Sequence, residues 1–214
     1  MLVSFRAVVE EHLPRAPGRV LEVGCGRGDL ARGVARLGYQ VSAIDPEAPV
    51  GAIFHAVSLE EFADPGPFDA VLSNLALHHI PDLCGALAKI RRLLRPGGRL
   101  IVNEHAGDRL DEPTARWFLE QRAAIGGDAP GSVERCLDEW LADHAGLHSS
   151  GAMRTELDRR FEAVLRLDAV PQSRAGRRDR RARGASSDRG RRDPGNRFPL
   201  RRRAAVASLR DGRS

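Results

Sequence analysis

The residues best suited to chemistry lie in a glycine-rich stretch near the start of the chain. Val20-Leu21-Glu22-Val23 is predicted to form a short buried strand, and it runs directly into Gly24-Cys25-Gly26-Arg27-Gly28. Glycines at this place permit a tight turn and let backbone N–H groups approach a ligand without interference from a Cβ atom. The next predicted strand ends at Asp45, whose carboxylate can accept hydrogen bonds from both hydroxyls of a ribose. The pattern favours a nucleoside-binding loop over an ordinary strand-to-helix turn.

The sequence of the same loop distinguishes between two kinds of nucleoside ligand, a dinucleotide and S-adenosylmethionine. Dinucleotide sites use the spacing G-x-G-x-x-G, but Asp29 stands where the last glycine of that pattern would fall. Glu22 would repel a pyrophosphate, whereas its charge suits a ligand that carries an ammonium group and a positive sulfonium. This combination indicates S-adenosylmethionine rather than NAD.

Four motifs follow one another over roughly residues 18–105. The first is E-x-G-x-G-x-G at Glu22–Gly28, and the second is the acidic strand end at Asp45. The third is Phe68–Asn74, continued by Leu77-His78-His79, and the fourth is Leu94–Leu100 after a helix. In this order they resemble the class I methyltransferases, which are seven-stranded, Rossmann-like and S-adenosylmethionine-dependent, and within these the small-molecule type.

The resemblance implies a role for each matched position. It assigns the methionine moiety of S-adenosyl-L-methionine to the glycine loop, the ribose to the end of the second strand, the adenine to residues after the third strand, and the sulfonium side to the end of the fourth. The implied cofactor-binding residues are Glu22, Gly24, Cys25, Gly26, Gly28, Asp45, Ser58, Leu59, Asn74 and Leu75. Family members often carry an Asp in the adenine stretch, and Val57-Ser58-Leu59 has none.

Three residues are candidates for a general base. Methyl transfer is an in-line displacement at an activated carbon, and it needs a base only when the nucleophile must lose a proton. His79 after the fourth strand, and Glu104 and His105 after the fifth, stand where such a base is expected. The alternative for His78-His79 is a loop pair with one packed and one solvated ring.

Other reactive side chains are given structural interpretations. His144 and His148 have the i, i+4 spacing of metal ligands, but without an H-E-x-x-H context we expect a solvated helix end and no metal. Cys25 is expected to be a small residue in the loop and not a nucleophile. Three cysteines far apart argue against a disulfide framework and for a reducing cytoplasm. Neither a signal peptide nor a membrane span is predicted, so no membrane partner is expected.

Alternating strands and helices predict the α/β class, with a doubly wound, mostly parallel sheet. Expected strands are 19–23, 40–45, 52–56, 68–73 and 99–103; expected helices are 3–14, one from Asp29, 82–94, 112–125, 132–146 and 151–167. The methyltransferase domain is expected to span 1–170, with a cofactor-binding half at 18–105. The last three helices form a predicted lid at 110–167, because insertions beside an active edge often cover substrate.

The end of the chain differs in composition. Residues 172–214 hold 15 Arg and 4 Asp, against 19 basic and 25 acidic residues elsewhere. Segment 171–214 is therefore predicted to be disordered, and closing strands six and seven of the sheet to be missing, which leaves an exposed edge on strand five. Because 33 of the 34 basic residues are Arg, which implies GC-rich codons, a reading-frame shift near 168–172 is one explanation of the tail.

Three functions remain open at this level. The first is transfer of a methyl group to a small-molecule acceptor. The second is an RNA or DNA methyltransferase that uses the basic tail, although the tail lacks the interleaved aromatic residues of nucleic-acid sites, and we do not expect this partner. The third is a cofactor-binding protein without turnover. The sequence specifies neither the acceptor atom nor the oligomeric state.

Overall fold

The computed structural model describes residues 4–124, 131–168 and 202–209. They fall into two compact units. Among these residues, the first is an α/β unit of 4–105, 146–168 and 202–209, and the second is a helical unit of 106–124 and 131–145.

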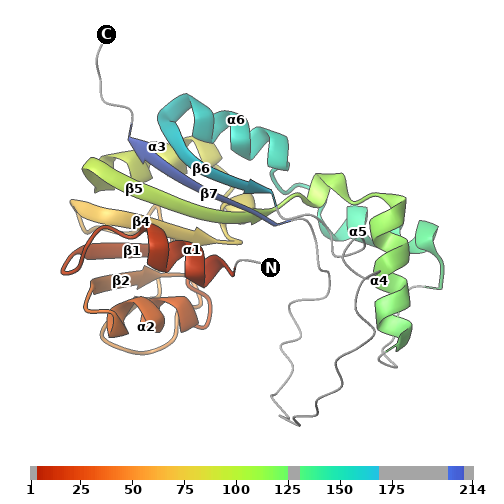
Figure 1. Ribbon diagram of the computed structural model, residues 1–214, viewed down its shortest axis with the longest axis horizontal. Coiled ribbons are helices and arrows are strands. Elements are labelled where there is room, and N and C mark those ends of the chain that lie inside the picture. Colours follow the sequence, from red (N-terminus) through yellow and green to blue (C-terminus); the bar gives the residue numbers. More distant parts are fainter. Residues whose placement is uncertain (1–3, 125–130, 169–201, 210–214) are drawn as a thin grey trace. The chain divides into compact units, whose positions relative to one another are not determined.

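The α/β unit is organised around a seven-stranded sheet in the order β3-β2-β1-β4-β5-β7-β6. The strands are β1 Arg19–Val23, β2 Gln40–Ile44, β3 Phe54–His55, β4 Phe68–Asn74, β5 Leu94–His105, β6 Phe161–Asp168 and β7 Arg202–Leu209. The first five pair in parallel, whereas β7 is antiparallel to both β5 and β6. Figure 1 shows β7 inserted between these two strands. The predicted doubly wound α/β fold is confirmed.

Helices cover both faces because side chains of successive strand residues alternate between them. Val20, Leu72 and Ile101 share a core with the helices α1 Phe5–His12 and α2 Asp29–Arg36. Leu21, Val71 and Leu100 share the opposite core with α3 Leu83–Leu93 and α6 Ser150–Arg160. By this alternation Glu22 points to the α2 face.

Three predictions about the end of the fold are wrong. The closing strands are present as β6 and β7, so the edge of β5 is paired rather than exposed, and 202–209 of the predicted disordered tail form a strand. The helix expected over 151–167 ends at Arg160, and Phe161 is already extended (φ −129°, ψ 148°). Pairing with β7 across a long stretch of chain determines this change, and a local hydrophobic spacing cannot reveal it. Residues 169–201 lie outside the described part, and the frame shift stays a prediction.

Ending the chain at Arg201 should destabilise the α/β unit. β5 and β6 would both lose the strand that lies between them, and each lost backbone hydrogen bond is worth about 1 kcal/mol. We expect the free energy of unfolding to fall by at least about 3 kcal/mol and the exposed edge to promote aggregation. Urea denaturation and light scattering measure both effects. A chain ending at Leu209 is the matched control, and equal stability of the two truncations would contradict the position of β7.

The helical unit contains η2 Gly107–Arg109, α4 Glu112–Ala124 and α5 Val133–Asp143. Its core joins Ala115 and Phe118 of α4 to Cys136 of α5, with Trp117 packed against them at partial burial. The third helix of the predicted lid, α6, instead belongs to the α/β unit, where Met153 lies in the sheet core. The lid role of 110–167 remains a prediction.

Candidate cofactor-binding and active site

The glycine loop after β1 has three residues in the left-handed region, Gly24, Gly26 and Gly28, with φ of 74°, 48° and 79°. A Cβ on Gly24 would lie 2.2 Å from Cβ of Ala76, and one on Gly28 would lie 2.4 Å from the ring of Phe54. A Cβ on Gly26 would meet nothing within 4 Å. Two glycines therefore allow close packing of the loop, whereas Gly26 faces open space.

Glu22 places a buried carboxylate beside this loop. The residue is 2% exposed, and its Oε2 has no hydrogen-bond partner among the described residues. The pKa of Glu22 is raised to about 8, mainly by burial and also by the charges of Asp29 and Asp45, and a hydrogen bond from the backbone of Ala31 at the start of α2 offsets part of the increase. A buried oxygen without a partner is costly and calls for a donor. A ligand cation at this place would supply one.

Asp45 joins the end of β2 to the glycine loop. Its Oδ2 accepts from the Gly26 N–H at 3.0 Å and its Oδ1 from the Glu47 N–H at 2.9 Å. The backbone N–H groups of Gly24 and Cys25 both donate to Ile44 O, at 2.9 and 3.1 Å. These bonds bring Asp45 to the loop as the sequence predicted.

These features fit the predicted cofactor. An ammonium group suits the unpartnered oxygen of Glu22, the open face at Gly26 leaves room for the ligand, and the carboxylate of Asp45 can accept from a ribose diol. The adenine stretch is less specific. Ser58 and Glu61 each accept from the other's backbone N–H, at 3.3 and 3.0 Å, and Leu59 is 5% exposed in the sheet core. Their adenine role stays a prediction.

The turn after β4 is tightly held by β5. Leu75 has φ 57°, which makes it the one non-glycine residue with positive φ among those described. Its N–H donates to Asn103 O at 2.8 Å, and Asn103 Nδ2 donates to Asn74 Oδ1 at 2.7 Å. Sequence reasoning selected Asn74 and Leu75 but missed Asn103, because only the register of two distant strands pairs it with Asn74.

The three base candidates have different surroundings. Glu104 is 7% exposed; its Oε1 accepts from the N–H groups of Ala76 and Leu77 at 3.0 and 2.8 Å, and its Oε2 lies 2.6 Å from His78 Nδ1. Both oxygens are thus occupied. His79 is exposed and the side chain of His105 lies outside the described part. His78 is 5% exposed, so one ring of the pair is packed and one is not, and its contact with Glu104 was not foreseen.

The histidines at 144 and 148 have separate partners. His148 Nε2 donates to Ile80 O at 2.9 Å, and the backbone N–H of His148 donates to His78 O at 3.3 Å. The ring of His144 stacks on Trp140 with centroids 3.5 Å apart. Within the described residues no group of three or more His, Cys, Asp or Glu side chains could hold a metal ion.

The three thiols should differ sharply in reactivity. Burial and the nearby Glu22 raise the pKa of Cys25 to about 12, and burial raises the pKa of Cys136, whereas Cys84 is exposed. Since the thiolate is the nucleophile, we expect one thiol to react rapidly with Ellman's reagent at pH 8 in the native chain, and three after denaturation. Cys84→Ser should remove the rapid reaction. A second rapid thiol in the native chain would contradict the burial of Cys25.

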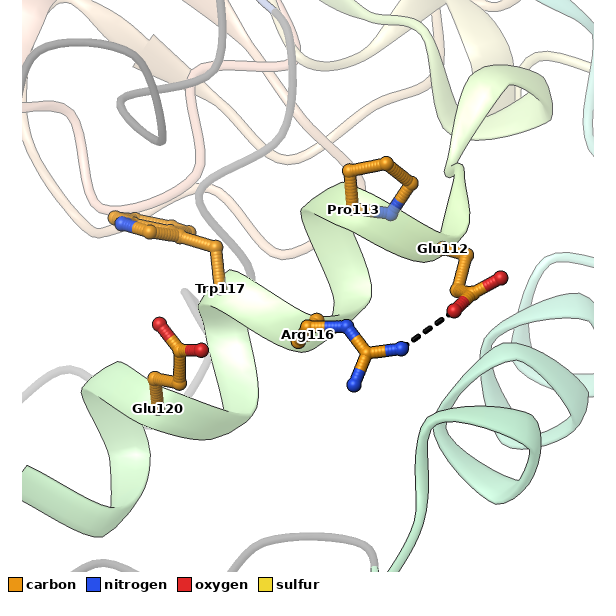
Figure 2. Close-up of a pocket in the computed structure, with 5 residues that line it drawn as sticks. All are labelled: Glu112, Pro113, Arg116, Trp117 and Glu120. Atoms are coloured by element: carbon orange, nitrogen blue, oxygen red, sulfur yellow. Dashed lines mark hydrogen bonds and ion pairs between the residues drawn. The ribbon is translucent and has the colours of Figure 1, made fainter.

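A pocket of about 360 Å³ lies along α4 of the helical unit. Its lining comprises Glu112, Pro113, Arg116, Trp117 and Glu120. Figure 2 shows Arg116 turned toward Glu112, with which it pairs at 2.5 Å, and Trp117 projecting away from that pair. Trp117 therefore has two surroundings: it packs at partial burial against the core of the helical unit, and it lines the pocket.

The sheet order, with the glycine loop after β1 hydrogen-bonded to Asp45 after β2, is that of the class I methyltransferase fold. A family model described as "Methyltransferase domain" matches residues 4–163, and the chain therefore belongs to this family. The resemblance drawn from the motifs is confirmed.

Curated relatives match less than half of the chain. A ubiquinone biosynthesis O-methyltransferase of Xanthomonas oryzae pv. oryzae is 40% identical over 110 residues, which cover 44% of this chain and 46% of the relative. The protein of the same name from Xanthomonas campestris pv. campestris is 42% identical over 103 residues, which cover 41% of this chain and 43% of the relative. The chain thus spans about half the length of the curated relatives that it matches.

Solved structures show the same fold. The 1,6-didemethyltoxoflavin-N1-methyltransferase of Burkholderia thailandensis, solved with bound 1,6-didemethyltoxoflavin and S-adenosylhomocysteine, has a TM-score of 0.57 at 21% identity, and the match covers 97% of this chain and 77% of that one. An S-adenosylmethionine-dependent methyltransferase of Mesorhizobium loti has a TM-score of 0.57 at 17% identity, with 96% and 98% covered. In the described part of this chain, no helix is long and apolar enough to cross a membrane.

Proposed function

We propose that the chain transfers a methyl group from S-adenosyl-L-methionine to a small-molecule acceptor by in-line displacement. The observation that carries this proposal is the combination of an unpartnered buried oxygen on Glu22 with an open glycine face at Gly26. The family model supports the same reaction class. The cofactor supplies a methyl group already activated by the sulfonium charge.

The ten predicted cofactor-binding residues form the proposed cofactor cradle, and each of them has a proposed task. Glu22 accepts from the ammonium group of the methionine moiety, and Gly24, Cys25, Gly26 and Gly28 present backbone to it. Asp45 accepts from the ribose hydroxyls, Ser58 and Leu59 border the adenine, and Asn74 and Leu75 line the sulfonium side. Because the methyl carbon is already electrophilic, holding the reactants in line and excluding water are the main contributions of the protein.

The acceptor is proposed to be a small molecule with an oxygen nucleophile, as the names of the curated relatives suggest. Where that oxygen must lose a proton, His79 and His105 remain the candidate bases. Glu104 is a weaker candidate, since three hydrogen-bond donors already occupy its two oxygens. A cytoplasmic location is proposed from three unpaired cysteines.

An assay of S-adenosylhomocysteine release tests the proposed function. The full chain would be incubated with S-adenosylmethionine and a panel of phenols, amines, carboxylic acids, RNA and DNA, with the His79→Gln variant as a probe of the base. Acceptor-dependent release with a small molecule is the expected result. Release only with RNA or DNA would support a nucleic-acid methyltransferase. Cofactor binding without release for any acceptor would favour a non-catalytic binding protein.

A further inference from the structure

Glu104 is connected to the cofactor cradle through the turn that follows β4. It belongs to β5, yet its carboxylate accepts the backbone N–H groups of Ala76 and Leu77, at the start of the 3-10 turn η1 Leu77–His79. A carboxylate at this position satisfies N–H groups that the short turn cannot pair itself. The contact of Oε2 with His78 adds a third bond to the same turn.

The turn needs such bonds because its backbone is strained. Leucine in the left-handed region is disfavoured relative to the ordinary helical region by steric contact of its Cβ. Strain of this kind persists only where the surroundings over-determine the conformation. The surroundings are the two neighbouring β5 residues Asn103 and Glu104, which together bind Leu75, Ala76 and Leu77 through their backbone N–H groups.

The position of this turn limits the position of the glycine loop. Gly24 lies so close to Ala76 that a Cβ on Gly24 would be 2.2 Å from Cβ of Ala76. Gly26, the glycine that faces open space, lies two positions after Gly24 in the same loop. Any displacement of Ala76 therefore changes the contact that sets one side of the cradle.

We propose that Glu104 is a positioning residue for the cofactor: it fixes the Leu75–His78 turn, and through Ala76 the glycine loop, and it is not the general base. This inference rests on the methyltransferase function proposed above. Glu104 acts on cofactor affinity without touching the ligand, through the N–H groups of Ala76 and Leu77.

A variant series at residue 104 separates positioning from proton transfer. Glu104→Gln keeps a carbonyl oxygen that can accept both N–H groups, and it should bind S-adenosylhomocysteine within about threefold of the parent chain. Glu104→Ala leaves two buried donors unpaired and should weaken binding about tenfold or more. Glu104→Asp retracts the carboxylate by one methylene and should give a smaller loss, and it replaces Glu104→Ala if that variant does not fold.

Asp69 provides a matched control at the opposite end of the same strands. Its Oδ2 accepts the Arg19 N–H at 2.7 Å, and its Oδ1 accepts from Arg95 Nε at 2.5 Å. Asp69→Ala should lower the melting temperature while leaving the affinity for S-adenosylhomocysteine unchanged. All titrations are made well below the melting temperature of each variant, so that a purely structural role does not alter the measured affinity.

Hydrogen exchange keeps the test independent of ligand binding. Without ligand, the amides of Gly24 to Gly28 should exchange faster in Glu104→Ala than in the parent chain, Glu104→Gln or Asp69→Ala. Unchanged exchange and unchanged affinity in both Glu104→Ala and Glu104→Asp would overturn the positioning role. Loss of turnover in Glu104→Gln with intact affinity would overturn it in favour of a general base. If the parent chain does not bind S-adenosylhomocysteine, the proposed function fails, and the exchange rates alone decide the positioning role.

Discussion

Gly26→Ala is expected to weaken S-adenosylhomocysteine binding roughly ten- to hundredfold while the chain still unfolds cooperatively. The new methyl group meets no protein atom within 4 Å, so it occupies the space that we assign to the ligand. Its cost to folding is about 1 kcal/mol, since alanine adopts the left-handed conformation less readily than glycine. Isothermal titration gives the affinity, and a thermal melt gives the stability.

Gly38→Ala is the control for this substitution. Gly38 has φ 91° and open space at its Cβ position, but it follows the end of α2, away from the glycine loop. It should lower stability and leave affinity unchanged. An equal loss of affinity in both variants, or no loss in Gly26→Ala, would contradict the ligand position. Gly24→Ala is not a usable probe, because its Cβ collides with Ala76.

Glu22→Gln should stabilise the ligand-free chain by about 3 kcal/mol at pH 7. The pKa of Glu22 is about 8 in the folded chain, above its ordinary value of 4.5, so the folded chain keeps a proton that the unfolded chain has lost between these values. Stability contributed by Glu22 is therefore fully present below pH 4.5 and lost as the pH rises through 8. Urea denaturation at pH 5 and pH 7 should show the gain of the variant growing with pH. A gain in stability that does not change with pH would contradict the raised pKa of Glu22.

The same carboxyl should couple ligand binding to proton release. An ammonium group beside Glu22 favours the carboxylate, so binding at pH 7 should expel close to one proton, and affinity should rise as the pH increases toward 8. The other groups facing Glu22 are Asp29, Asp45 and Cys25, and the Cys25 thiol, with its pKa near 12, keeps its proton in this range. Titrations in two buffers of different ionisation enthalpy measure the release. Identical heats in both buffers, or the same release from Glu22→Gln, would contradict the assignment.

The elements that carry local patterns were predictable from the sequence. β1 has the predicted bounds, and the glycine loop and Asp45 come together as expected, because a strand, a tight turn and a strand end are specified within short segments. The two closing strands were missed, since β7 is a short strand within an arginine-rich segment of the sequence and is defined only by the strands on either side. The helical spacing of apolar residues likewise continues through Phe161, but the backbone changes from helix to strand at that residue.

Only part of the candidate site was predictable from the sequence. Glu104 was selected for its place after the fifth strand, but its carboxylate is hydrogen-bonded to the backbone of Ala76 and Leu77, 28 and 27 positions away. Asn103 and the contact of His78 with Glu104 were missed for the same reason. Residue type and strand position select a candidate group, whereas the hydrogen-bond partners of that group become visible only in three dimensions.

A thermal melt of the 214-residue chain with and without S-adenosylhomocysteine tests the central claim most directly. At a ligand concentration 100 times the dissociation constant, binding to the folded state alone adds about 2.7 kcal/mol. We predict a single cooperative transition that rises with ligand concentration and does not respond to NAD. A cooperative transition that is indifferent to S-adenosylhomocysteine would contradict the cofactor site formed by Glu22, Gly26 and Asp45.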